Sequence, residues 1–172
     1  MPINPRMTKR LNKELENALE CHDPYIWYRP VTEDKQTWHF TIRGPKGSPF
    51  EGGVYHGRIE LPDEYPIKAP DFYFLTENGR YKINTKICLN ISGYHLEQWQ
   101  PATTIDAMVR MIQAFMEDYS EAANGLGFIQ TSVKERKCLA KLSRDFICPK
   151  CGKILDLMTP FPWIVCFPTH SY

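Results

Sequence analysis

Three short segments with the patterns of β-strands constrain the fold of this chain more than any other feature. They are residues 38–43 and 55–61, which alternate apolar and polar residues, and residues 71–75, a short run rich in aromatic residues. A period of two residues is typical of a strand with one face in a core and the other toward solvent. Residues 44–47 supply a turn, and the proline-rich residues 62–70 form a stiff, exposed loop outside any ladder. The pattern predicts three half-buried strands in an antiparallel meander.

Apolar residues at intervals of three and four predict a helix before these strands. Four of them, including Leu11 and Leu19, lie on one face of residues 8–21, and charged residues occupy most of the other positions. The helix should end before Pro24, because a proline disfavours helical geometry in the preceding residue. We expect the mostly apolar residues 25–31 to be a connector.

Two more helices are expected after the strands. Residues 105–116 place their apolar side chains on one face, with Thr103 or Thr104 as the N-cap, and should form the central core helix. Ser132 and Glu135 make a capping box at the start of a surface helix. The narrow apolar stripe of that helix consists of Leu139, Leu142 and Phe146. The expected fold class is α+β: an N-terminal helix, an antiparallel β-meander, a central core helix and a C-terminal helix.

Composition narrows the class of protein. A length of 172 residues suits one domain with a short appendage, and a net charge of +1 gives no reason to expect a nucleic-acid partner. No run of about 18 apolar residues occurs, so no membrane span is expected. The N-terminus lacks a secretory signal, and the six cysteines should therefore stay reduced. These features predict a cytoplasmic or nuclear protein.

Cys88 is the candidate for chemistry. It lies in an alternating stretch, residues 86–91, that runs into the polar loop 92–95. A reactive thiol needs partly open, irregular backbone, whereas an inert cysteine packs wherever the surroundings are apolar. These residues alone leave both interpretations open.

Five motifs in order resemble the ubiquitin-conjugating enzymes over about residues 7–146. They are WHFTI at 38–42, GPKGSPFEGGVY at 44–55, LPDEYPIKAP at 61–70, KICL at 86–89 and WQPA at 99–102. Three further stretches are similar to the Ubc6-like, endoplasmic-reticulum-associated branch. They are TENGRY at 76–81, ISGYH at 91–95, and AKLSRDF at 140–146 followed by CPKCG at 148–152. The resemblance implies a catalytic domain at 1–146 and a short Cys- and Pro-containing tail at 147–172. It also implies a fourth strand, which would lie around residues 81–83 or be much reduced.

The resemblance implies that Cys88 accepts ubiquitin as a thioester and passes it, with a ligase, to a substrate lysine or, as an alternative acceptor, a hydroxyl group. A thiolate attacks one thioester and leaves from the next at comparable energy. The family's usual His-Pro-Asn before the cysteine is absent. Asn78 stands in the corresponding branch motif and is our candidate for an oxyanion or loop-ordering role, the alternative being a simple Asn-Gly turn. His95 is a candidate for tuning acceptor deprotonation, the alternative being an exposed loop histidine.

The resemblance also implies three partners: ubiquitin, an activating enzyme and a ligase, most readily of the RING type. Leu61, Pro101 and Ala102 correspond to the two loops that meet ligases, where exposed apolar residues on rigid loops make good anchors. Lys9 and Lys13, with Arg10, match the face that engages the activating enzyme. The alternative for these three is a solvated basic face.

No cofactor is expected, since ATP is used by the activating enzyme. Cys148 and Cys151 resemble half of a zinc site, and Cys166 and His170 are ligands of suitable kinds. The gap between the two pairs is apolar and contains prolines, which favours paired or free thiols and no metal.

Two other functions remain open at this stage. One is a non-catalytic module that binds ubiquitin or a ligase on the same fold, which the missing His-Pro-Asn favours and the retained Cys88 disfavours. The other is conjugation of a different ubiquitin-like modifier. The branch usually carries a C-terminal membrane helix that this chain lacks, so we expect a cytoplasmic protein, with the cytosolic face of the endoplasmic reticulum as the alternative location.

Overall fold

The computed structural model describes residues 5–87, 99–118 and 125–161 of the chain. Helix α1 (Pro5–Glu20) precedes four strands, β1 (Ile26–Pro30), β2 (Thr37–Arg43), β3 (Val54–Glu60) and β4 (Asp71–Phe74). Helices α2 (Ile105–Phe115) and α3 (Val133–Ser143) follow, and then come β5 (Ile147–Cys148), β6 (Gly152–Lys153) and the 3-10 helix η3 (Ile154–Leu157). The predicted α+β class is confirmed.

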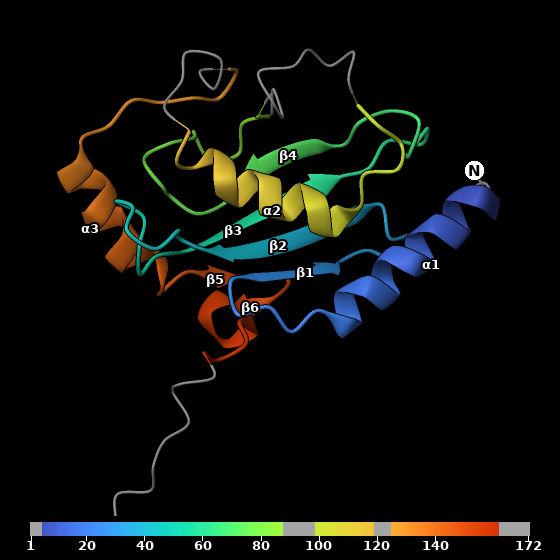
Figure 1. Cartoon of the computed structure of the whole chain (residues 1–172), viewed down its shortest axis with the longest axis horizontal. Helices are drawn as coiled ribbons and strands as arrows, with labels where there is room; N and C mark the ends of the chain where they lie inside the picture. Colours follow the sequence, from blue (N-terminus) through green and yellow to red (C-terminus); the bar gives the residue numbers. More distant parts are fainter. Residues whose placement is uncertain (1–4, 88–98, 119–124, 162–172) are drawn as a thin grey trace, which may run out of the picture.

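The four long strands form an antiparallel sheet in the order β1-β2-β3-β4. Figure 1 shows α2 lying across this sheet, with α1 and α3 near its opposite ends. The expectation of a connector at residues 25–31 is wrong, because β1 pairs with β2 from Ile26 to Pro30. Pro30 is tolerated because β1 is an edge strand, where a missing N–H need not break a ladder.

The fourth strand of the sheet is therefore β1, and residues 81–83 do not form it. Tyr81 makes only an isolated bridge to Phe128. The mixture of aromatic residues, Arg29 and Pro30 hides the alternation of β1, whose inward residues are Ile26 and Tyr28.

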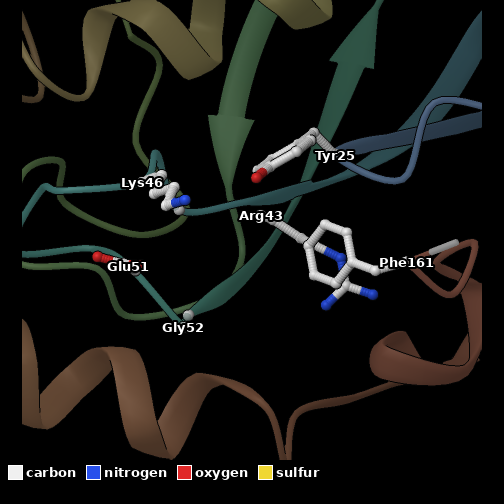
Figure 2. Close-up of a pocket in the computed structure, with 8 residues that line it drawn as sticks. Tyr25, Arg43, Lys46, Glu51, Gly52 and Phe161 are labelled. Carbon is white, nitrogen blue, oxygen red and sulfur yellow. The ribbon is translucent and has the colours of Figure 1, made fainter. Parts of the chain in front are cut away.

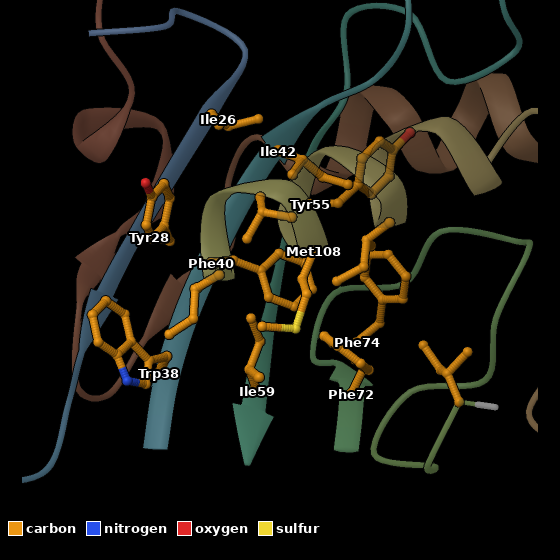
Figure 3. Packing of buried hydrophobic residues seen from close by; sticks show 14 of the residues in the cluster. Ile26, Tyr28, Trp38, Phe40, Ile42, Tyr55, Ile59, Phe72, Phe74 and Met108 are labelled. Atoms are coloured by element: carbon orange, nitrogen blue, oxygen red, sulfur yellow. The ribbon is translucent and has the colours of Figure 1, made fainter. Parts of the chain in front are cut away.

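The main core lies between α2 and one face of the sheet. Trp38, Phe40 and Ile42 from β2 meet Met108 of α2, together with aromatic residues of β3 and β4, as Figure 3 shows. Thr104 caps α2 by accepting a hydrogen bond from the Ala107 N–H at 3.1 Å, as one of the two predicted caps. The predicted central core helix is confirmed by the complete burial of Ile105, Met108 and neighbouring apolar residues.

The other face of the sheet is also covered, so the prediction of half-buried strands is wrong for β2 and β3. His39, Thr41 and His56 point to this face and are all buried. A second apolar cluster covers it, and its members come from β1, β3 and the chain after α3. Its buried members are Val54, Cys148, Ile154 and Met158.

Two helix faces also differ from their predictions. Leu19 of α1 is exposed, and Met7 and Glu14 are buried beside Leu11 and Ala18. In α3 the predicted stripe is wrong, because Leu142 is exposed while Arg136, Ala140 and Ser143 are buried. The small residues Ala140 and Ser143 let the second half of α3 approach β3, where the Ser143 hydroxyl accepts a hydrogen bond from the Val54 N–H at 2.9 Å.

Candidate active site

Hydrogen bonds anchor Ile87 and Trp99, the described residues on either side of the segment that carries Cys88. Ile87 is buried, and its N–H donates to the Phe72 carbonyl of β4 at 2.9 Å. On the far side, the Trp99 indole N–H donates to the Pro66 carbonyl at 2.7 Å. Cys88 and His95 lie outside the described residues, and their predicted roles stay predictions. The anchors place the two ends of the Cys88 segment beside β4 and the proline-rich loop.

Residues 125–129 lie against residues 80–87, the irregular stretch that precedes Cys88. The Lys82 N–H donates to the Gly127 carbonyl at 2.7 Å, and the Ile129 N–H donates to the Arg80 carbonyl at 3.0 Å. Gly127 has a φ of +84°, and a Cβ there would lie 3.1 Å from the Lys86 carbonyl oxygen. Glycine therefore suits this position both by its dihedral angle and by its close approach to the backbone.

Asn78 is fully buried and uses its whole amide on nearby backbone. Its Nδ2 donates to the carbonyls of Thr76 and Tyr81 at 3.0 and 3.1 Å. Its Oδ1 accepts from the N–H groups of Arg80 and Tyr81 at 2.8 and 2.7 Å. All four bonds lie within residues 76–81, so in this conformation the amide holds the loop in shape and has no hydrogen left for an oxyanion.

Arg80 is a buried cation for which the sequence predicted no role. Its guanidinium donates to the Asp118 carbonyl after α2 and lies 4.3 Å from the centre of the Phe128 ring. It thus joins the Asn78 loop to residues 118 and 128, on both sides of a segment outside the described residues. The signal in the sequence was the position of Arg80 within the Asn-Gly-Arg-Tyr turn motif. An arginine that such a turn directs inward must find partners when it is buried.

Arg10 is a structural clamp and not part of a freely solvated face. Its guanidinium donates to Glu14 at 2.7 Å and to the carbonyls of Pro101 and Thr103 at 2.7 and 2.6 Å. The buried Glu14 carboxylate in turn accepts from the Ile105 N–H at 3.0 Å, at the start of α2. An anion is favoured there by the helix dipole. Lys9 and Lys13 are exposed, as the predicted partner face requires.

The two predicted ligase loops lie side by side through Tyr65 and Trp99, whose ring centres are 6.5 Å apart. Pro101 and Ala102 are exposed. The expectation that Leu61 is an exposed anchor is wrong, because only 5% of it is accessible. Ile67 is the exposed apolar residue of this loop, at 72%. Leu61 directly follows β3, and its side chain packs into the main core. Ile67 follows Pro66 on the outside of the loop.

A separate cavity of about 330 Å³ lies near the Arg43 end of β2, away from the Ile87 and Trp99 anchors. Figure 2 shows Arg43 beside the Phe161 ring, with its guanidinium carbon 4.6 Å from the ring centre, and Tyr25 nearby. None of the predicted site residues within the described ranges lines this cavity.

The described residues do hold one cluster of metal-binding types. His39, His56, Cys148 and Cys151 place their ligand atoms within 4.8 Å of one another. The predicted pairing of Cys148 and Cys151 with Cys166 and His170 is not tested, because the last two lie outside the described residues. Two histidines of the sheet are therefore the nearest candidates that the structure offers to these cysteines.

The topology, a central helix over a four-stranded antiparallel meander, defines the α+β class of the domain. Residues 10–134 match the family described as ubiquitin-conjugating enzyme. The chain belongs to the ubiquitin-conjugating enzyme family, as the motifs predicted.

Known proteins support this assignment over most of the chain. Ubiquitin-conjugating enzyme E2 J1 of Homo sapiens is 46% identical over 155 residues, which cover 88% of this chain and 47% of the relative. Ubiquitin-conjugating enzyme E2 6 of Kluyveromyces lactis is 37% identical over 138 residues, covering 80% of this chain and 54% of the relative. The prediction of Ubc6-like relatives is thus confirmed. The chain spans about half the length of these curated relatives.

Solved structures agree on the fold. A putative ubiquitin conjugating enzyme from Plasmodium yoelii aligns with a TM-score of 0.65 at 26% identity, covering 81% of this chain and 96% of that chain. Within the described ranges, each helix is too short or too polar to cross a membrane.

Proposed function

We propose that this protein accepts ubiquitin from the activating enzyme as a thioester on Cys88 and transfers it to a substrate lysine. Family membership supports the reaction type, and the Lys-Ile-Cys-Leu motif supports the residue. The observation that carries the proposal is the double anchoring of the Cys88 segment, by Ile87 on β4 and by Trp99 on Pro66. These contacts hold Ile87, the residue before Cys88, at β4 and hold Trp99 at the proline-rich loop.

The chemistry needs only a thiolate and an exchange of acyl groups. Cys88 Sγ attacks the thioester on the activating enzyme, the activating enzyme's thiolate leaves, and the new thioester keeps the acyl group reactive. The neutral acceptor amine then attacks the carbonyl and gives up a proton to solvent, and Cys88 leaves as a thiolate. Arg80 and Asn78 act in this scheme as positioning residues, because they shape the loop ahead of the Cys88 segment.

The test is a charging assay with activating enzyme, ATP and ubiquitin, analysed with and without reductant. Wild-type protein should form an adduct that reductant removes, and Cys88→Ser should form an oxyester that survives reductant but not alkali. Cys88→Ala should form neither, whereas Cys138→Ser, which alters an exposed cysteine of α3, should charge like wild type.

Failure of the wild type to charge with ubiquitin or any ubiquitin-like modifier would overturn the proposal and favour a non-catalytic binding module. Charging with another modifier but not with ubiquitin would replace the substrate. A reductant-sensitive adduct on Cys88→Ala would show that the wrong cysteine has been assigned.

The partners follow from the same proposal. The exposed Lys9 and Lys13 of α1 suit an acidic surface of the activating enzyme, and the paired loops with Ile67, Pro101 and Ala102 suit a RING-type ligase. Arg10 lies where the basic face of α1 meets the ligase loops. The activating enzyme and the ligase would therefore bind adjacent surfaces, one after the other.

We further propose that the protein works at the cytosolic face of the endoplasmic reticulum, which rests on its similarity to the Ubc6-like branch. Expression of this chain with a small epitope tag, followed by membrane flotation, tests the location. Recovery with the membranes, released by high salt and digested by added protease, is the expected result, because no described helix can cross a membrane. Recovery only in the soluble fraction would contradict it.

A further inference from the structure

The sheet face away from α2 holds two buried histidines whose rings meet edge to face, at an interplanar angle of 76°. His39 of β2 and His56 of β3 are 5% and 0% exposed. Since His39 pairs with Arg58 and His56 with Thr41, the histidines are diagonal neighbours on this face. Their Nδ1 and Nε2 atoms approach to 3.1 Å, and the ring centres are 5.0 Å apart. The nitrogens of buried imidazoles need hydrogen-bond or metal partners.

The hairpin of β5 and β6 brings two thiols to the same point. Cys148 Sγ lies 3.5 Å and Cys151 Sγ 3.3 Å from His39 Nδ1. Gly152 has a φ of +80° and lets the Cys-Pro-Lys-Cys-Gly turn fold tightly enough for both thiols to face one way. Two cysteines separated by two residues on such a turn are a frequent half of a zinc site.

Hydrogen bonding alone cannot satisfy this convergence. His39 Nδ1 is approached by one nitrogen and two sulfurs, yet an imidazole nitrogen donates one hydrogen or accepts one. A cation at the centre satisfies all four groups at once. The second nitrogen of His56 is already engaged with the Thr41 hydroxyl at 2.8 Å, which fixes the ring and leaves Nε2 toward the thiols.

We propose that His39, His56, Cys148 and Cys151 bind one structural zinc ion that fastens the 147–158 segment to the sheet. A set of two thiolates and two imidazoles matches the ligands and the tetrahedral preference of zinc. Zinc bonded to sulfur at about 2.3 Å and to nitrogen at about 2.0 Å separates ligand atoms by roughly 3.3–3.8 Å. The observed separations from His39 Nδ1, from 3.1 to 3.5 Å, are close to this range.

The charges suit such a site. Two thiolates cancel the charge of the ion, so the buried group is neutral as a whole. Neutral imidazoles and thiolates are the forms that bind zinc, so binding would release the two thiol protons to solvent.

The ligand set differs from the sequence prediction, which joined the two cysteines to Cys166 and His170 and favoured no metal. The difference has a simple physical origin. His39 and Cys148 lie 109 residues apart in the chain, and only the fold brings them together.

The direct test is the metal content of the full chain, purified from zinc-supplemented cells without metal-affinity chromatography or chelators. We expect about one zinc ion per chain, measured by inductively coupled plasma mass spectrometry. Exchange for Co²⁺ should give the visible bands of a tetrahedral ion and the near-ultraviolet bands of thiolate-to-cobalt charge transfer. The cobalt spectrum reports the ligands without any substitution, so it decides the case even if variants fold poorly.

Matched variants assign the ligands. Cys151→Ser and His56→Asn should lower zinc retention at least tenfold against a competing chelator. Cys138→Ser and Cys166→Ser should retain zinc like wild type. Cysteine alkylation provides a second readout, because zinc should protect Cys148 and Cys151 but not Cys138, and removal of zinc should end that protection.

Three outcomes would overturn the proposal. They are a folded wild type that takes up no zinc or cobalt, a cobalt complex without thiolate bands, and undiminished zinc in Cys151→Ser. Loss of zinc in Cys166→Ser would reject this ligand set in favour of the alternative tail site.

Discussion

Arg10 shows how one side chain can link two partner surfaces. It was expected to contribute only positive charge to an exposed helix face. In the structure its guanidinium instead ties α1 to the carbonyls of Pro101 and Thr103, next to Glu14. An arginine can do this because its fork presents several donors at fixed angles, which a lysine cannot reproduce.

Arg10→Ala should destabilise the protein by about 2–3 kcal/mol, because it removes charge-assisted hydrogen bonds and leaves the Glu14 carboxylate with one partner fewer. Urea denaturation measures this change. Lys9→Ala, on the exposed side of the same helix, is the matched control and should change stability by less than about 0.5 kcal/mol. Equal effects of the two substitutions would contradict the clamp.

Asn78→Asp should destabilise the protein by about 2–4 kcal/mol, because a carboxylate would face the two carbonyls that now accept from Nδ2. Thermal unfolding provides the measurement, and single-turnover discharge to free lysine should slow as well, since the loop ahead of Cys88 is disturbed. Asn84→Asp is the control: Asn84 is exposed with a φ of 52°, a conformation that aspartate also adopts. If Asn78→Asp discharges more slowly at unchanged stability, a direct role at the reacting carbonyl replaces the loop-ordering role.

At the scale of elements, regular patterns were predictable and long-range contacts were not. The core face of α2 and the caps of α2 and α3 follow from local spacing, because a helix records its buried side every three or four residues. The pairing of β1 could not be found in this way, since Arg29 and Pro30 mask its alternation. Leu61 was misassigned for a similar reason: its exposure depends on how the loop folds back, and a single apolar residue carries no period.

Ile67→Ser should weaken ligase-stimulated discharge without lowering stability, because the side chain is 72% exposed on the loop beside Trp99. We expect roughly a tenfold loss of stimulation by a RING domain, the effect of removing an apolar anchor worth about 1.4 kcal/mol. The assay compares discharge with and without the ligase domain. Ile147→Ser, at an isoleucine that is 68% exposed on β5, is the matched control and should leave stimulation unchanged. Equal losses at both positions, or none at Ile67, would remove this loop from the ligase surface.

At the scale of the whole molecule, one sheet separates two apolar clusters. The larger lies under α2 and was predicted in outline from the alternation of β2 and β3. The smaller joins Val54 and Trp27 of the sheet to Cys148, Ile154 and Met158 from the chain after α3. Nothing local in the sequence shows that the polar side of β2 is covered, because His39 and Thr41 look like solvent-facing residues. The candidate metal cluster escaped prediction for the same reason.

The second cluster should make the segment after α3 part of the cooperative fold. Ile154→Ala should lower the free energy of unfolding by about 2–4 kcal/mol, because it opens a cavity at a residue with no exposed surface. Ile147→Ala, at an exposed isoleucine a few residues earlier, should cost less than about 0.5 kcal/mol. Urea denaturation makes the measurement, followed by tryptophan fluorescence and by circular dichroism. The fluorescence reports both clusters, because Trp27 packs on the smaller one and Trp38 lies in the larger one. The two signals should change at the same urea concentrations in wild type and in the variants. A separate transition at lower urea concentration, seen only in Ile154→Ala, would contradict this prediction. It would mean that the chain after α3 unfolds independently and that the sheet is stable without it.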